Sequence, residues 1–240
     1  MCTYTIFPKT PVGPVLGFNL DDSLEWANSP TFASKPILQE PQGSIYRLSV
    51  GGGGCELEQE AKQVYPFRPE TFDCQNLNEV EKLLTRYGDF PDQPHHAGYI
   101  DLDTLETLAI DKTLGAIDHR RTDDGVIFDT YGGYQSVKLA KLCDQHGPLF
   151  EYYKNRMAVM TQIIEAHSIQ LGIDAMWQVL LDRTPGGEVC QHADTRPKGI
   201  QFVTLATMVI APRQGKQWIR WLKDGRPPAE SDPVEYTWGS

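Results

Sequence analysis

The sequence lacks the features that would place the chain in a membrane, in a secretory route or on nucleic acid. Its 240 residues contain no stretch near the roughly 20 apolar residues that a transmembrane helix needs. The amino terminus has no basic region followed by an apolar run, so no secretory signal is visible. Acidic residues outnumber basic ones by 32 to 22, and the formal net charge of -10 argues against nucleic acid or an anionic membrane as the main partner.

Cysteines are few and scattered. The sequence has 5 of them, at positions 2, 55, 74, 143 and 190, and none forms a CxxC pair. An odd and dispersed set does not indicate a disulfide framework. Cys190 and His192 in "CQH" are two candidate ligands without partners, which is too few for a zinc site. We therefore expect no metal and no cofactor, and a reduced, cytoplasmic protein.

Size and composition are those of a globular protein. Hydrophobic residues make up 40% and charged residues 22% of the chain, and 240 residues can bury a substantial core. The sequence shows no internal repeat, no low-complexity linker and no obvious boundary. We therefore expect a single domain over residues 1–240.

The amino-terminal half reads as strands with one helix. Alternating β-branched and aromatic residues predict three strands, at 3–7 ("TYTIF"), 15–20 ("VLGFNL") and 44–50 ("SIYRLSV"). Residues 76–87 predict a helix, with Asn78 and Glu81 resembling a capping box.

A run of strands is predicted next, after a polar turn that contains His95 and His96. The runs 99–111, 113–120 and 125–131 alternate between apolar and polar residues, which is typical of half-buried antiparallel strands. Together they predict a meander.

The carboxyl-terminal half begins with two helices and returns to strands. The long helix has one apolar face, made of Phe150, Tyr153, Met157, Met160, Ile164 and His167. A shorter helix follows at 173–183, then strands at 202–211, 217–222 and 234–238. Strands and helices in separate blocks predict an α+β fold. We expect a four-layer αββα sandwich of two antiparallel sheets with helices outside.

The first residues carry the most specific chemical signal. Cys2 follows the initiator methionine, and removal of Met1 would leave a thiol and a free α-amine on one residue. Such a residue can act as nucleophile and base together. Alternatively, Cys2 is an ordinary strand residue at a frayed terminus. Its position alone leaves both interpretations open.

Both ends of the chain are similar to N-terminal-nucleophile hydrolases. The opening resembles the choloylglycine hydrolases, and the matching residues are Cys2, Thr3, Gly17, Asn19, Leu20 and Asp21. The last third resembles the isopenicillin-N acyltransferase-like family, and the matching features, in order, are Arg156, "VLLDR", "CQH", "TLATMVIAP", "QWIRWL" and "DGRPPAE". The resemblance implies the N-terminal-nucleophile hydrolase fold.

The resemblance also implies a set of site residues. Cys2 would be the nucleophile and Asp21 would hold and orient the α-ammonium group. Asn19 would give an amide donor to an oxyanion or a substrate carbonyl, and Arg156 would stabilise the nucleophile region or a substrate carboxylate. Tyr131 stands where the family has an asparagine and would supply a hydroxyl donor instead.

Each of these residues also has an ordinary structural interpretation. Asp21 and Asn19 are compatible with turn chemistry, Arg156 with a solvated helix position, and Tyr131 with a packed aromatic. Thr207 stands where related chains often have serine, and both a site role and a structural role remain possible for it.

The implied function is an amidohydrolase or acyltransferase that acts on a small amide-linked acyl substrate through a Cys2 thioester. Phe18 replaces the arginine that usually precedes Asn-Leu-Asp, and Tyr131 replaces the asparagine. These departures favour the alternative of a catalytically impaired binding or accessory protein on the same fold. The sequence leaves the oligomeric state open, a homo-oligomer included.

Overall fold

Two antiparallel sheets organise the computed structural model of the chain, which describes residues 3–23, 45–51, 74–86, 95–113, 116–122, 126–130, 148–167, 169–192 and 202–237. The first sheet has the strand order β10-β9-β8-β2-β1-β7 and the second has the order β3-β4-β5-β6. The strands of the first sheet are β1 (Thr3–Phe7), β2 (Val15–Ser23), β7 (Ile127–Thr130), β8 (Phe202–Ala211), β9 (Lys216–Trp221) and β10 (Val234–Thr237). The strands of the second sheet are β3 (Ile45–Gly51), β4 (His95–Asp101), β5 (Thr107–Thr113) and β6 (Ala116–Thr122).

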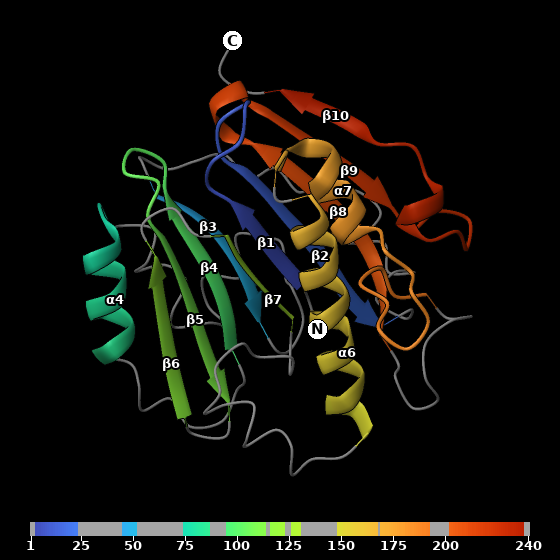
Figure 1. Cartoon of the computed structure of the whole chain (residues 1–240), viewed down its shortest axis with the longest axis horizontal. Helices are drawn as coiled ribbons and strands as arrows, with labels where there is room; N and C mark the ends of the chain where they lie inside the picture. Colours follow the sequence, from blue (N-terminus) through green and yellow to red (C-terminus); the bar gives the residue numbers. More distant parts are fainter. Residues whose placement is uncertain are drawn as a thin grey trace.

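Helices cover the outer face of each sheet. The described helices are α4 (Leu77–Arg86), α6 (Pro148–Ala166) and α7 (Ile173–Leu180), with short 3-10 turns η3 (Pro212–Gln214) and η4 (Pro228–Glu230). Figure 1 shows α6 and α7 in front of the first sheet and α4 beside the second. The order helix, sheet, sheet, helix confirms the predicted αββα sandwich.

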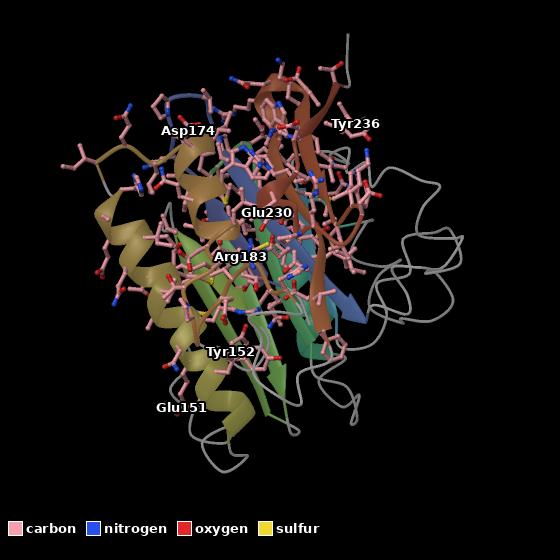
Figure 2. The ribbon with its side chains drawn as sticks, turned by 90° about the vertical axis from the view of Figure 1, so that its right-hand side faces the viewer. Glu151, Tyr152, Asp174, Arg183, Glu230 and Tyr236 are labelled. Carbon is pink, nitrogen blue, oxygen red and sulfur yellow. The ribbon has the colours of Figure 1, made fainter. Side chains whose placement is uncertain are left out.

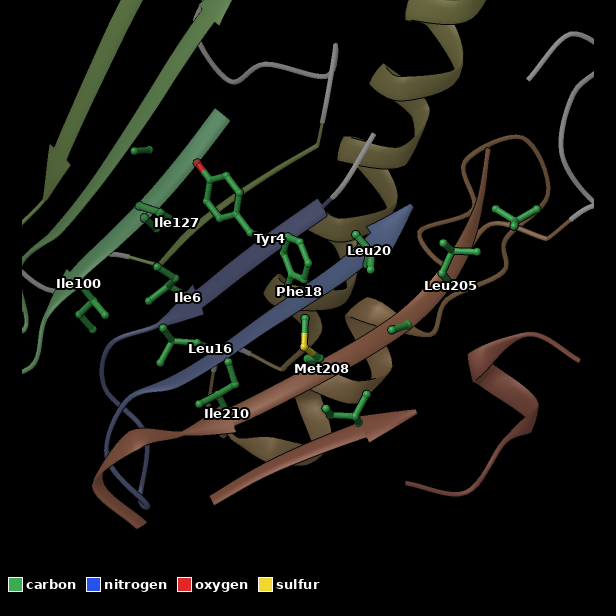
Figure 3. Packing of buried hydrophobic residues seen from close by; sticks show 14 residues of the cluster. Tyr4, Ile6, Leu16, Phe18, Leu20, Ile100, Ile127, Leu205, Met208 and Ile210 are labelled. Atoms are coloured by element: carbon green, nitrogen blue, oxygen red, sulfur yellow. The ribbon is translucent and has the colours of Figure 1, made fainter. Parts of the chain in front are cut away.

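Three buried clusters of apolar side chains hold these layers together. Between the sheets, Tyr4 and Ile6 of β1 pack with Ile100 of β4 (Figure 3). Outside the first sheet, Phe7 and Val209 pack against α6 and α7. The third cluster joins α4 to the outer face of the second sheet and consists of Leu77, Val80, Tyr99, Leu108 and Ile110. Alternation along each strand explains the division, because successive side chains point to opposite faces.

Two glycines allow close approach between layers. A Cβ at Gly17 would lie 2.2 Å from the sulfur of Met176, so α7 rests directly on β2 there. A Cβ at Gly98 would lie 2.7 Å from the ring of Tyr4, so the two sheets also meet closely. Gly17 was identified in the sequence by resemblance, and its structural reason is this contact with α7.

Several local predictions were wrong. His95 and His96 lie in strand β4 and not in a turn. The run 99–111 forms parts of two strands with a turn between them, and Asp101 caps this turn by accepting from the backbone N–H of Asp103 at 2.9 Å. Strand β7 joins the first sheet through β1 and not the meander. The helix cap is also displaced.

The cap of α4 lies before the predicted position. Asn76 Oδ1 accepts from the backbone N–H of Glu79 at 3.0 Å, and the Glu79 carboxylate accepts from the backbone N–H of Gln75 at 2.8 Å. These bonds resemble a capping box formed by Asn76 and Glu79, not by Asn78 and Glu81, except that Glu79 bonds the backbone N–H of Gln75 instead of that of Asn76. Over the described residues, no helix is long and apolar enough to span a membrane.

Candidate active site

Strand β2 carries two of the predicted site residues on its helix-facing side. Asn19 pairs with Thr3 of β1 and with Thr207 of β8. The register between β2 and β8 then shifts between Leu20 and Asp21, so that Asp21 lies opposite Thr204. An irregularity of this kind redirects side chains, and it is common beside active sites.

The register shift between β2 and β8 determines which residues lie next to Asp21. Leu205, which a regular register would place opposite Asp21, instead packs in the core between the sheets. Thr204 faces Asp21 and donates from its hydroxyl to Oδ1 at 2.7 Å. The carboxylate therefore has a hydrogen-bond donor beside it on the neighbouring strand.

Arg156 of α6 meets Asp21 in the interior. Its Nη1 lies 3.2 Å from Oδ2 of Asp21 and also donates to the Thr3 hydroxyl at 3.1 Å. Both charged side chains have no solvent exposure. The resemblance placed Arg156 near the site, and the structure brings it to Asp21 and to the first described residue of β1. The alternative of a solvated Arg156 is wrong.

Burial and pairing oppose each other at this ion pair. Complete burial raises the pKa of Asp21 above its usual value, although the positive charge of Arg156 partly offsets it. Burial is the largest single influence on Arg156 and works against its charge, but the Asp21 carboxylate together with Tyr152 and Tyr153 outweighs it and raises the pKa of Arg156. Arg156 therefore stays charged, and Asp21 takes up a proton more readily than an exposed aspartate.

Asn19 has a different role from the one expected. Its Nδ2 donates to the backbone carbonyls of Leu180 at 2.8 Å and Val189 at 2.9 Å, so both amide hydrogens are used inside the protein. Asn19 thereby ties β2 to the end of α7 and to the segment 181–192, which we call the α7–β8 loop. In this arrangement the amide has no hydrogen left for an oxyanion, and the site does not gain a donor from Asn19.

Three buried residues that the sequence analysis did not single out, Tyr152, Glu188 and Gln191, form a hydrogen-bonded group of which Tyr152 contacts Arg156. Tyr152, one turn before it on α6, accepts from Arg156 Nη2 at 3.5 Å. The Tyr152 hydroxyl also accepts from Gln191 Nε2 at 3.3 Å and donates to the carbonyl of Glu188 at 3.2 Å. The spacing of four residues between Tyr152 and Arg156 is a signal that could have identified Tyr152, since such positions share a helix face.

The α7–β8 loop is fixed at several points. Arg183 Nη1 lies 2.7 Å from Glu230 Oε1 beside η4 (Figure 2), and His192 Nε2 lies 2.9 Å from the carbonyl of Gly225. Glu188 is fully buried in this loop, and within the described part of the chain neither carboxylate oxygen has a hydrogen-bond partner.

Thr207 has no described hydrogen bond to this network, whereas the Cys190 thiol contacts it through the Thr204 side chain. Thr207 lies beside Asn19 with a buried hydroxyl that has no hydrogen-bond partner in the described ranges. Cys190 is buried, and burial raises the pKa of its thiol to about 12, so it stays protonated and unreactive at neutral pH. Cys2 and Tyr131 lie outside the described residues.

Comparisons with known proteins identify the fold. No protein-family model matches the sequence, and no curated protein matches it. Among solved structures, it is similar to a cysteine-to-alanine mutant of the conjugated bile acid hydrolase from Clostridium perfringens, with a TM-score of 0.51 and 10% identity over 100% of this chain and 97% of that one. An arginine-to-leucine variant of the same enzyme aligns with a TM-score of 0.42 and 12% identity, over 99% of this chain and 89% of that one. The first of these similarities shows that the chain has the fold of that hydrolase, the N-terminal-nucleophile hydrolase fold.

Proposed function

We propose that this protein is an N-terminal cysteine amidohydrolase or acyltransferase whose nucleophile is Cys2. The observation that carries the proposal is the buried contact of Arg156 with both Asp21 and Thr3. The proposal places Cys2, the residue that precedes Thr3 in the chain, within the influence of this ion pair. Burying two charges carries a desolvation penalty, which is offset only when the pair has good geometry and further hydrogen bonds.

The proposed reaction proceeds through a thioester. The Cys2 thiol adds to the amide carbon of the substrate, and the α-amine takes the thiol proton. The carbon–nitrogen bond breaks as that proton passes to the leaving amine. Water or a second amine then attacks the thioester, and a proton from the incoming nucleophile returns to sulfur. Water gives hydrolysis, and an amine gives acyl transfer.

The described residues have separate roles in this reaction. Asp21 carries the negative charge that orients the α-ammonium group, and Thr204 fixes the carboxylate. Arg156 supplies a positive charge beside Thr3, which favours the thiolate form of a neighbouring thiol. We assign Asn19 a positioning role, because its amide holds the α7–β8 loop.

The substrate class is a small molecule with an amide-linked acyl group. The structurally similar enzyme is described as a conjugated bile acid hydrolase. The proposal takes from it the amide bond as the cleaved bond and leaves the acyl group and the amine open.

The matched variants Cys2→Ala and Cys74→Ser test the proposal. Release of amine from a panel of acyl amides is measured for each. Cys2→Ala should abolish release, whereas Cys74→Ser should leave it unchanged, because Cys74 lies beside α4 on the far side of the second sheet. Full activity in Cys2→Ala would overturn the proposal.

A second candidate, a non-catalytic binding protein, is favoured by Phe18. This side chain is 2% exposed and packs in the core between the sheets, so the chain has a buried apolar group where the resembled family has an arginine. Intact mass separates the two candidates, because a protein that keeps Met1 has no free α-amine on Cys2.

A further inference from the structure

The hydroxyl of Tyr152 has its whole hydrogen-bonding capacity in use. It donates once, to the carbonyl of Glu188, and accepts twice, from Gln191 Nε2 and Arg156 Nη2. A phenol has one hydrogen and two lone pairs, so all three are occupied. Burial raises the pKa of Tyr152, which keeps this hydrogen in place at neutral pH.

The same loop also holds the other member of the ion pair. The backbone N–H of Gln191 donates to the Thr204 hydroxyl at 2.8 Å, and that hydroxyl donates to Asp21. Gln191 therefore connects to Asp21 through its main chain and to Arg156 through its side chain and Tyr152.

The loop is pressed against α6 at this point. A Cβ on Gly187 would lie 3.0 Å from the carbonyl of Asn155 and 3.2 Å from the backbone nitrogen of Arg156. A side chain at position 187 would require the loop or α6 to shift by a few tenths of an ångström, so glycine favours this close approach. In addition, the ring of Tyr152 lies 5.4 Å from the guanidinium carbon of Arg156.

We propose that Tyr152 is a positioning residue, through which the α7–β8 loop holds the guanidinium of Arg156 between Asp21 and Thr3. The proposal rests on the proposed function, in which the charge of Arg156 acts on the Cys2 thiol. Without the hydroxyl, one guanidinium nitrogen loses an acceptor in the interior, and the side chain has freedom to turn away from Thr3.

The test is the pH dependence of thiol alkylation, which needs no substrate. Cys2 in wild-type protein and in Tyr152→Phe is alkylated with iodoacetamide between pH 5 and pH 9, and the modified peptide is mapped. Because Arg156 favours the thiolate, Tyr152→Phe should alkylate between about threefold and tenfold more slowly at neutral pH, with its profile shifted to higher pH. The kcat for an amide substrate should fall by a similar factor, with KM within about twofold.

Tyr236→Phe is the matched control. Tyr236 is half-buried on the edge strand β10, at the opposite end of the molecule from Tyr152 (Figure 2). This variant loses the same oxygen and should keep the wild-type alkylation profile. A role in packing alone would change thermal stability in Tyr152→Phe without moving the profile.

Gln191→Met covers the case in which Tyr152→Phe does not fold. It removes the Nε2 donor and leaves the contact between Tyr152 and Arg156, so a smaller shift in the same direction is expected. A wild-type profile in the folded variants overturns the proposal for Tyr152 and leaves the proposed function standing. If wild-type Cys2 alkylates like an exposed, unperturbed thiol, both proposals fail.

Discussion

Nη1 of Arg156 lies 3.2 Å from Oδ2 of Asp21, and neither side chain reaches solvent. Residues 135 positions apart in the chain thus share one charge pair in the interior. Removing either charge alone would take away the opposite charge of this pair while the other stays buried.

Arg156→Met is expected to cost about 3–5 kcal/mol of folding free energy, because it removes the positive charge that pairs with Asp21 in the interior. The double variant Arg156→Met with Asp21→Leu should recover much of that loss. Urea unfolding of the two single variants and the double variant measures the coupling. Losses that simply add would show that the pair is not coupled.

The activity of the protein should have an acid limb above the usual range for aspartate. Burial raises the pKa of Asp21 above the ordinary aspartate value of 3.8. The proposed reaction requires Asp21 in its ionised form. Activity should therefore fall as the pH drops through the raised pKa. Asp21→Asn should be slower at all pH values and should lack this limb. An unchanged limb in kcat/KM for Asp21→Asn would assign it to another group.

The raised pKa of Asp21 also predicts the direction in which folding stability changes with pH. The folded state binds the Asp21 proton more tightly than the unfolded chain, so this contribution to stability is full below pH 3.8 and is lost as the pH rises through the folded value. The difference in unfolding free energy between wild type and Asp21→Asn should therefore change with pH over that window.

Gly17→Ala is expected to destabilise the fold by about 1–3 kcal/mol, because the new methyl group would overlap Met176. Gly172→Ala, at the start of the same helix, is the matched control, since a Cβ there meets nothing within 4 Å. It should cost at most about 1 kcal/mol, through the weaker helix cap. Equal melting temperatures for the two variants would contradict the close contact between α7 and β2.

Much of the fold follows from local patterns in the sequence. The alternation in β1, β2 and β8 and the apolar face of α6 are strong enough to be identified without tertiary information. Strand partners were harder: β7 resembles the meander strands in composition, yet it pairs with β1. Alternation shows that a strand is half-buried, but it does not show which sheet the strand extends.

The sequence allowed the prediction of those site residues whose side chains act directly, such as Asp21 and Arg156. Asp21 and Arg156 were identified through resemblance, whereas a helical wheel alone placed Arg156 off the apolar face. Its burial depends on a partner from β2, which no periodicity in α6 reveals. Gln191 acts partly through its backbone N–H, and the sequence carries no signal for that contact.

Glu188→Gln should leave the protein as stable as the wild type or more stable, because it removes a buried carboxylate whose oxygens have no hydrogen-bond partner within the described residues. Thermal unfolding measures the change, with Glu165→Gln on the exposed side of α6 as the neutral control. A large loss of stability in Glu188→Gln would mean that the carboxylate is paired in solution.

The most direct test of the account is to stop the reaction during turnover with acid and to locate the bound acyl group by peptide mass spectrometry. The account predicts a protein that has lost Met1 and an acyl thioester on the amino-terminal peptide that begins with Cys2. Cys190 and Cys74 should remain unmodified. An active protein that keeps Met1, or an acyl group attached to any other residue, would contradict the account.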